Sequence, residues 1–319
     1  MPIGSKAVYV PAKLPSANFW DVDDDHLVVV KATDPWVDWF QPGDWNKRRN
    51  SSRPLGKWQV PSTFVVADAT EHYTPNEAAA FLQPDGETIR SLEPTCRPTP
   101  NGPIWGWESN KSNLYGDGIS GSHFGSGLSV MGGTIRKGEF STDAPIRHAI
   151  KIEVWGKYLY YGSDRTGFRW PADRSDGNAS KGYQGANRTL VMGSLLAIRP
   201  GVKAEDLGLM TKPGRILFRA LQDYGAYLCD DSGWDAANIC AESGVREEFR
   251  NRFGYSFSSD GGKNAAWVHD LNELLKSLSV VDNNSVEHVG GGGAPRVPLA
   301  PPLAPKSEGS AYLKKLAGG

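Results

Sequence analysis

Residues 115–140 read YGDGISGSHFGSGLSVMGGTIRKGEF, and residues 146–174 read IRHAIKIEVWGKYLYYGSDRTGFRWPADR. Glycines, aromatic residues and short β-forming runs alternate through both segments, and ionisable residues of every catalytic type stand among them. Glycine at turns and bulges lets strands curve and lets a ligand come close to the backbone. The two segments therefore predict curved β-structure that carries a site for a polar, extended ligand.

The composition of the whole chain points to the same class of fold. The chain has 319 residues with Gly 37, Pro 22 and Trp 11, and few long helical patterns. Many turns and aromatics with short strands favour a mainly β protein, and we expect a β-sandwich or jelly roll with a few peripheral α-helices. The expected helices are 74–82, 211–224, 245–252 and 265–278, and the expected strands are 26–31, 60–67, 146–155, 190–198, 226–229 and 279–282.

Composition shifts suggest three regions. Residues 1–59 read as an N-terminal arm and Trp-rich segment, residues 60–285 as a β-rich catalytic or binding domain, and residues 286–319 as a Gly/Pro-rich tail. Within the tail, Gly290 to Gly293 reads as a flexible spacer before a Pro-rich extended run. We expect the tail to act as a linker, a wrap along the body or an interaction arm, so the termini are candidates for self-association.

The charge and the hydropathy of the chain argue against a nucleic-acid-binding protein and against a membrane-spanning one. The net charge of −1 provides no basic field for nucleic acid, and no run of about 18 apolar residues predicts a membrane span. The three cysteines do not form a full disulfide framework, and Cys229 and Cys240 are either paired or buried thiols. The N-terminus has no apolar leader pattern; a leader removed from the chain would agree with the extracellular location that we expect.

The candidate catalytic residues are two carboxylates and the groups that can move protons beside them. Glu139 is paired with Asp117 or Asp173 for acid–base glycosidic cleavage, the alternative being surface salt bridges. His148 is expected on the apolar face of its strand, where it is either a core histidine or a catalytic base. The other candidates that can move protons or bind charge are His123, expected in an exposed loop, Arg136 and Tyr160.

Aromatic and basic residues around these positions are candidates for substrate binding. Tyrosine and tryptophan stack on sugar rings and arginine binds carboxylates, although the same residues also serve ordinary cross-strand packing. The binding candidates are Lys151, Glu153, Trp155, Tyr161, Arg169, Trp170 and Asp173. We expect no cofactor, with one exception: Asp230, Asp231 and Asp235 are candidate ligands for Ca²⁺.

The blocks GSGLSVMGGTIRKGE, IRHAIKIEVW, RWPADR and LQDYGAYLCDD resemble a family of functionally uncharacterised bacterial proteins. Relatives of that family often stand beside carbohydrate-binding modules, which implies work on glycans. The chain is also faintly similar to jelly-roll polysaccharide lyases, whose Arg, His and Tyr/Lys residue types it contains without their signature strings.

The sequence thus predicts a carbohydrate-active protein that cleaves an extended polysaccharide by hydrolysis or β-elimination. The alternative is a non-catalytic glycan-binding or structural assembly protein of a cell surface or viral particle. In either case the expected partner is a polysaccharide and not nucleic acid.

Overall fold

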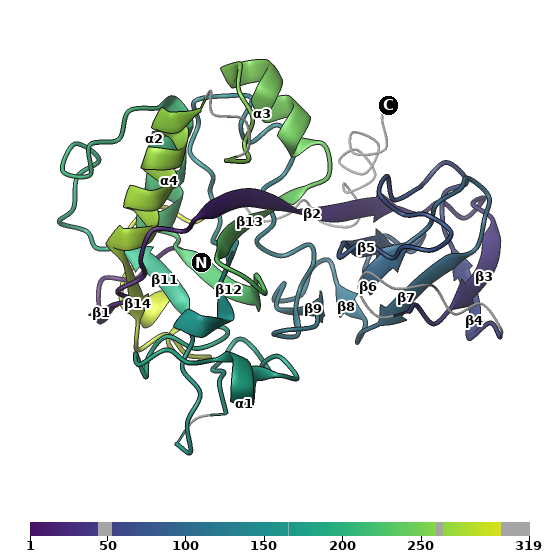
Figure 1. Ribbon diagram of the computed structural model, residues 1–319, viewed down its shortest axis with the longest axis horizontal. Helices are drawn as coiled ribbons and strands as arrows, with labels where there is room; N and C mark the ends of the chain where they lie inside the picture. The colour runs from purple at the N-terminus through teal and green to yellow at the C-terminus, as the bar shows by residue number, and fades with distance from the viewer. Residues whose placement is uncertain (44–52, 165, 260–263, 301–319) are drawn as a thin grey trace. The chain divides into compact units, whose positions relative to one another are not determined.

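The computed structural model describes residues 1–43, 53–164, 166–259 and 264–300. The chain is mainly β with few helices, as expected (Figure 1). Its contacts divide it into two compact units. The first unit holds residues 1–23, 124–128 and 133–300, and the second holds residues 24–123 and 129–132. These boundaries differ from the divisions at 59/60 and 285/286 that the composition suggested.

The first unit is built on a mixed sheet in the order β1-β14-β11-β12-β10-β13-β2. The pairs β1–β14, β11–β14, β11–β12 and β10–β13 are antiparallel, and β10–β12 is parallel. Strand β2 is long and belongs to this unit as far as Asp23. The strands are β1 (Tyr9–Pro11), β2 (Phe19–Val29), β10 (Ile150–Val154), β11 (Leu195–Ile198), β12 (Ala226–Asp231), β13 (Ala236–Glu242) and β14 (Leu278–Val281).

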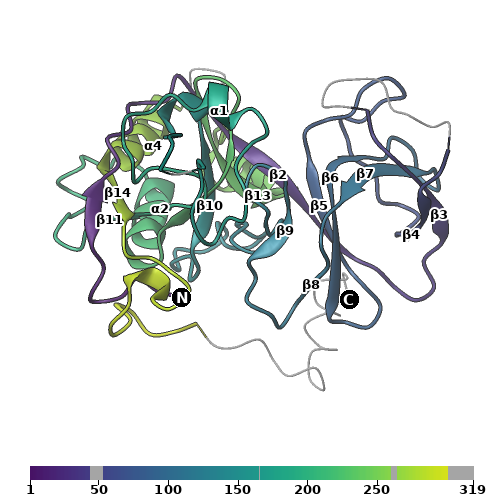
Figure 2. The ribbon, with the colours of Figure 1, turned by 90° about the horizontal axis from the view of Figure 1, so that it is seen from below.

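Two helices, α2 (Lys212–Asp223) and α4 (Ala265–Ser277), lie side by side against the strands of the first unit (Figures 1 and 2). Their apolar stripes pack on the sheet, where Leu217 and Leu271 belong to the same core as Ile150 and Ile152. Helix α2 begins as the sequence predicts, because the Thr211 hydroxyl accepts a hydrogen bond from the amide of Gly214. The remaining helical elements are η1 (Gly156–Tyr158), α1 (Ala179–Gly182), α3 (Val245–Phe253) and η2 (Val289–Gly291).

Within the second unit the sheet order is β2-β5-β6-β7-β3-β4, and β8 pairs with β6. The β2–β5 and β3–β7 pairs are parallel, and the other pairs are antiparallel. Its core contains Trp58, Phe81, Leu92 and Ile104. The strands are β3 (Trp36–Phe40), β4 (Gly56–Gln59), β5 (Ala78–Leu82), β6 (Thr88–Cys96), β7 (Ile104–Glu108), β8 (Ser112–Asn113) and β9 (Ser120–His123).

Two local expectations are wrong in this unit. Residues 74–82 do not form a helix, because Ala78–Leu82 is strand β5, buried along its whole length. Residues 60–67 do not form a strand; the strand β4 ends just before them, at Gln59.

The two ends of the first unit are joined by a glycine run. Gly290 to Gly293 all adopt positive φ, between 72° and 86°. Their backbone accepts hydrogen bonds from the amides of Gly4 and Lys6, and the amide of Arg296 donates to Ile3. The run is therefore an ordered clasp rather than a flexible spacer, and residues 286–300 wrap along the first unit. The rest of the predicted tail, residues 301–319, lies outside the described residues.

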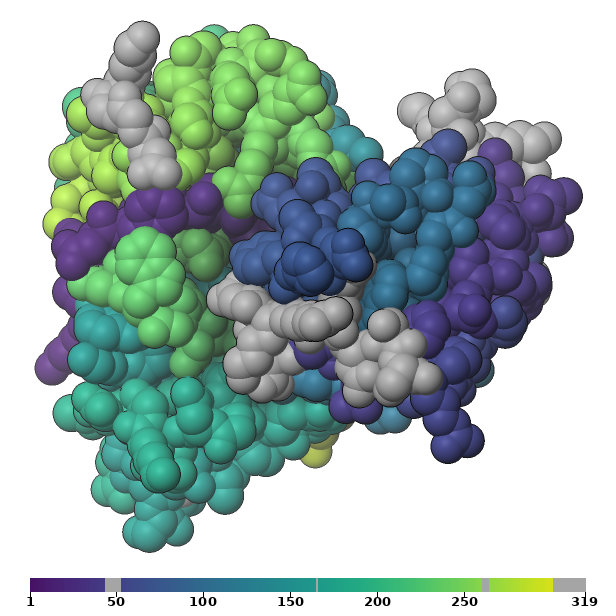
Figure 3. All heavy atoms as spheres, turned by 45° about the vertical axis from the view of Figure 1, so that its right-hand side comes forward, coloured from purple at the N-terminus to yellow at the C-terminus, as the bar shows by residue number. Residues whose placement is uncertain are grey.

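The N-terminal segment lies on the surface of the first unit. Figure 3 shows it in purple, passing between green atoms of later residues on both sides. On one side Asp21 forms an ion pair with Arg246 of α3, and on the other Phe19 contacts Trp234. The segment thus brings Asn18 and Phe19 beside the turn that joins β12 to β13. Of the helices described, none has the length and apolar character needed to cross a bilayer.

Candidate functional site

Three carboxylates of the first unit form one compact group. Asp230 and Asp231 end strand β12, and Asp176 lies in the loop just before α1. One oxygen of each carboxylate lies within 4.8 Å of an oxygen of each of the others. We call Asp176, Asp230 and Asp231 the acidic group.

Glycines let the backbone pass directly against these carboxylates. A Cβ atom on Gly125 would lie 2.2 Å from Oδ1 of Asp230, and one on Gly156 would lie 2.5 Å from Oδ2 of Asp231. Gly127, with φ +77°, stands in the same relation to Asp173 at 2.2 Å. Real Cβ atoms do not approach so closely, so these glycines are required by the packing of the acids.

Burial raises the affinity of Asp231 and Asp176 for protons. Burial, and then the charge of Asp176, raise the pKa of Asp231 to about 6. Burial also raises the pKa of Asp176, which is hydrogen-bonded to Asp230 and accepts a hydrogen bond from the Tyr183 hydroxyl. A hydrogen bond between two carboxyl groups requires a proton on one of them. The acidic group can therefore hold and release protons near neutral pH.

A second set of acids lies deeper in the same unit. Glu153 of β10 stands opposite Asp230 in the sheet register. Burial, and then the charge of Asp23, raise the pKa of Glu153 well above its ordinary value, while the Asn238 amide donates to it at 2.8 Å. Lys151 on the same strand is also buried. Lys151 and Glu153 were predicted to bind substrate, and both lie buried inside the unit.

The structure brings together only two of the three residues that were predicted to bind Ca²⁺. Asp230 and Asp231 do come together, but with Asp176. Asp235 instead accepts hydrogen bonds from the Tyr158 hydroxyl at 3.2 Å and the Asn18 amide at 2.5 Å. Carboxylate oxygens at the spacing of the acidic group suit Ca²⁺ or Mg²⁺, and a Ca²⁺ site there stays a prediction.

Aromatic side chains gather on both sides of Asp235. Phe19 and Trp234 lie with ring centroids 5.1 Å apart, and Trp234 is 54% exposed. Trp155 packs edge-on against Tyr158 at 5.8 Å. We call these four residues the aromatic rim. Trp155 precedes Gly156, which touches Asp231, so the rim adjoins the acidic group.

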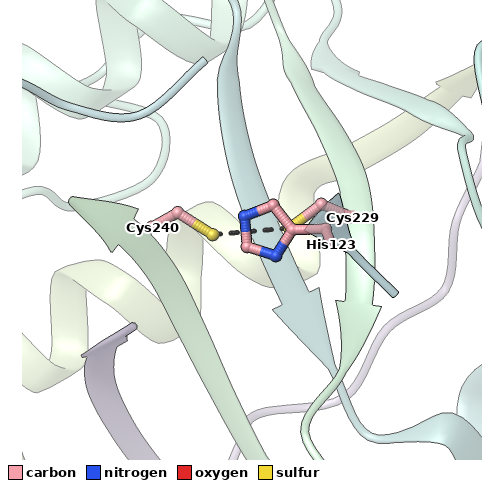
Figure 4. A group of neighbouring side chains, drawn as sticks. All are labelled: His123, Cys229 and Cys240. Atoms are coloured by element: carbon pink, nitrogen blue, oxygen red, sulfur yellow. Dashed lines mark hydrogen bonds between the residues drawn. The ribbon is translucent and has the colours of Figure 1, made fainter. Parts of the chain in front are cut away.

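The thiols of Cys229 and Cys240 lie in the core beside these acids. They stand on β12 and β13, and their sulfur atoms point toward each other at 3.4 Å (Figure 4). Among the described residues, which include all three cysteines, none forms a disulfide. Burial raises the pKa of the Cys229 thiol to about 11, which makes it a poor nucleophile.

Three of the predicted catalytic residues lie together elsewhere on the first unit. His148 Nε2 lies 3.1 Å from both carboxylate oxygens of Glu139, and its Nδ1 lies 2.9 Å from the carbonyl of Ala149. The amide of Arg136 donates to the same carboxylate at 2.8 Å. Burial acts to raise the pKa of Glu139, but His148 and Arg136 hold it below its ordinary value. The lowered pKa keeps Glu139 ionised near neutral pH, which suits it poorly to donate a proton.

The expected positions of two candidates were wrong. His148 is not on a strand, because β10 begins at Ile150, and its side chain is partly exposed. His123 is not an exposed loop residue: it ends β9 in the second unit with no exposed surface, 3.4 Å from Asp25. Asp117, in the same unit, is exposed and its carboxylate caps the amide of Ile119 at 3.0 Å.

The remaining candidates take part in separate polar contacts. The Tyr160 hydroxyl donates to Asp164 at 2.8 Å, and Arg169 pairs with Asp282 at 3.0 Å. Asp173 pairs with Arg174 at 2.6 Å beside Gly127. Tyr161 is exposed at 38%, and Trp170 is partly buried. Of the catalytic and binding candidates, Glu153, Trp155 and Asp173 are therefore the ones that lie at or beside the acidic group.

Sequence reasoning missed Asp176 and Tyr183 altogether. The available signals were the glycines at 125 and 127 and the acid doublet after a buried strand. Comparisons of the chain with family models, with curated proteins and with solved structures each found no match.

Proposed function

We propose that this protein hydrolyses glycosidic bonds in an extended polysaccharide, with the acidic group of the first unit as its catalytic carboxylates. The observation that carries the proposal is the close spacing of Asp176, Asp230 and Asp231, together with the pKa of about 6 at Asp231. Glycosidic hydrolysis needs one carboxyl that is protonated near neutral pH and a second that is ionised beside it.

The roles follow from the proton balance of the group. Asp231 donates its proton to the leaving oxygen, since its raised pKa keeps it protonated in mildly acidic solution. The ionised member of the Asp176–Asp230 pair attacks the anomeric carbon. Asp231, now ionised, then takes a proton from the water that releases the sugar from its carboxylate ester.

The separation of the carboxylates favours retention of configuration. Retaining enzymes hold their two carboxyl groups about 5–5.5 Å apart, whereas inverting enzymes need about 6.5–9.5 Å to admit a water molecule. Oxygens within 4.8 Å of one another leave no room for that water. We therefore expect the product to keep the anomeric configuration of the substrate.

The aromatic rim supplies the surface on which sugar rings would stack. Trp234 is 54% exposed and packs against Phe19, and Trp155 precedes Gly156, whose backbone lies against Asp231. Such faces bind the apolar side of a pyranose ring while neighbouring polar groups bind its hydroxyls.

Hydrolysis is better supported than β-elimination. Elimination needs a cation to neutralise a uronate carboxylate. Arg169 is instead paired with Asp282, and Arg136 stands beside Glu139. The acidic group itself would repel a uronate.

A panel of neutral, acidic and amino polysaccharides tests the proposal. Wild-type protein should release reducing ends from at least one of them, without the ultraviolet absorbance of unsaturated products. Asp231→Asn and Asp176→Asn should abolish that release while the proteins stay folded, and Glu139→Gln should retain it. Binding without product would favour the non-catalytic glycan-binding alternative, and unsaturated products would favour elimination.

A further inference from the structure

We propose that the ligand of the aromatic rim is a glycan whose sugars carry protonated amino groups. This inference rests on the proposed function for its reaction, but it concerns which polymer the surface selects. It is drawn from the residues that converge on Asp235.

Asp235 stands at the centre of the rim. It follows Trp234 in the chain and accepts hydrogen bonds from Tyr158 on one side and Asn18 on the other. Asn18 precedes Phe19, which contacts Trp234, and Tyr158 contacts Trp155. A carboxylate beside the exposed ring of Trp234 is the chemistry that recognises an organic cation, because the ring face and the carboxylate both attract positive charge.

Several acidic side chains lie close to the rim. The acids Asp231 and Asp176 lie next to it, and Asp173 lies beyond Gly127. Lys157 lies over the Trp155 ring at 4.3 Å, and Arg174 is paired with Asp173. A chain of ammonium groups would be attracted here, whereas a chain of uronates would be repelled.

The raised proton affinity of the acidic group agrees with this charge balance. Burial raises the pKa of both Asp231 and Asp176, and repulsion from the charge of Asp176 raises that of Asp231 further. An ammonium group bound at the rim would lower that repulsion. Neutral or acetylated sugars could stack on the aromatic faces, but they would leave the negative charge unbalanced.

Binding to the Asp231→Asn variant tests the inference without turnover. The probes are a glucosamine oligomer, the same oligomer fully N-acetylated, and a uronate oligomer of equal length, titrated by calorimetry at pH 6. We expect the glucosamine oligomer to bind about tenfold or more tightly than its acetylated form. The preference should shrink in high salt, and the uronate oligomer should not bind.

Two further variants test whether Asp235 and Trp234 cause the preference for amino sugars over acetylated ones. In the same background, Asp235→Asn should bring the two glucosamine forms to similar affinity, and Trp234→Ala should weaken both. Circular dichroism checks that each variant is folded, and Trp234→Phe serves as the conservative replacement that restores binding. Equal affinity for amine and acetyl forms, tighter binding of uronates, or no binding at all would overturn the inference.

The outcomes separate this inference from the proposed function. If amino oligomers bind selectively but wild-type protein releases no reducing ends, the hydrolytic function fails and the selectivity stands. If wild-type protein cleaves a neutral or acidic polymer and shows no preference for amines, the selectivity fails and the hydrolytic function stands.

Discussion

The backbone of Gly125 lies so close to Asp230 that a Cβ atom at residue 125 would be 2.2 Å from the carboxylate oxygen. The same atom would be 2.9 Å from Oδ1 of Asp176. The loop and the acidic group therefore fix each other's position. Gly125→Ala should displace Asp230 and lower hydrolysis about a hundredfold, because small misplacements of catalytic groups are costly. Initial rates measure the effect. Gly177→Ala is the matched control, since a Cβ atom there meets nothing within 4 Å, and equal rates for the two variants would contradict this account.

Asp231→Asn should make the protein more stable at neutral pH. The pKa of Asp231 is about 6 in the folded protein against an ordinary 3.8, so between these values the folded state binds more protons. The stability of the wild-type protein therefore falls as the pH rises through this window. Asparagine does not titrate, so the variant does not lose stability in this way. After allowance for partial exposure we expect a gain of about 1–2 kcal/mol at pH 7 and none near pH 4. Urea unfolding at both pH values measures it; a gain that is the same at both would argue against a raised pKa.

Glu139→Gln should show the opposite dependence on pH. The pKa of Glu139 in the folded protein is held below its ordinary 4.5. The ionised carboxylate therefore stabilises the folded state above pH 4.5, and this stabilisation is lost as the pH falls through the folded-state pKa. The variant should lose about 0.5–1 kcal/mol at pH 7 and show little change near pH 3. Thermal unfolding across this range is the measurement. His148→Ala should give a similar loss at pH 7, and neither change should lower hydrolysis more than a few-fold if the pair is structural.

Adding one methyl group at Gly4 should disrupt the clasp between the two ends of the first unit and destabilise the protein. A Cβ atom on Gly4 would lie 2.0 Å from the carbonyl oxygen of Gly292, and that oxygen belongs to the backbone and cannot turn aside. Gly4→Ala should therefore cost roughly 1–3 kcal/mol. Gly201→Ala, where the added atom meets nothing within 4 Å, controls for the change of residue type. Melting temperatures compare the two, and an unchanged value for Gly4→Ala would argue against the clasp.

The cysteines should be unreactive in the folded protein and fully reduced after unfolding. Cys96, Cys229 and Cys240 are all buried, and burial raises the pKa of Cys229 to about 11. A thiol reagent should find almost no reactive group under native conditions. In denaturant without reductant it should titrate all three thiols. Recovery of a single thiol would instead show that Cys229 and Cys240 are bonded.

Local signals in the sequence predicted some elements well. The helices at α2 and α4 carry a regular apolar stripe, and α2 also has the Thr211 cap, so local preference and tertiary packing agree there. Residues 74–82 begin with an equally good helix-capping pattern, but residues 78–82 of this stretch form strand β5. Ala78–Leu82 is buried on both faces between β2 and β6, and Glu77 pairs with His26. Tertiary pairing outweighed the local preference, and a run buried on both sides has no period that distinguishes strand from helix.

The candidate site was predicted less well, for a related reason. Asp230 and Asp231 were visible as an acid doublet after a strand, but their partner Asp176 comes from a distant loop. Parallel pairing of β10 with β12 and the close passage of Gly125 bring these residues together, and neither relation has a local signature. Glu139 and His148 were predicted separately as catalytic candidates, and they lie 3.1 Å apart. The arrangement of the strands as a sandwich or jelly roll stays a prediction.

The most direct measurement compares the initial rates of Asp231→Asn and Glu139→Gln on the polysaccharide that wild-type protein cleaves best. Both changes replace one carboxylate of the first unit by an amide of the same shape, so the pair separates chemistry from general disturbance. We predict a loss of at least about a hundredfold for Asp231→Asn and a near wild-type rate for Glu139→Gln. A folded Asp231→Asn variant that retains full activity would contradict the assignment of the acidic group as the catalytic site.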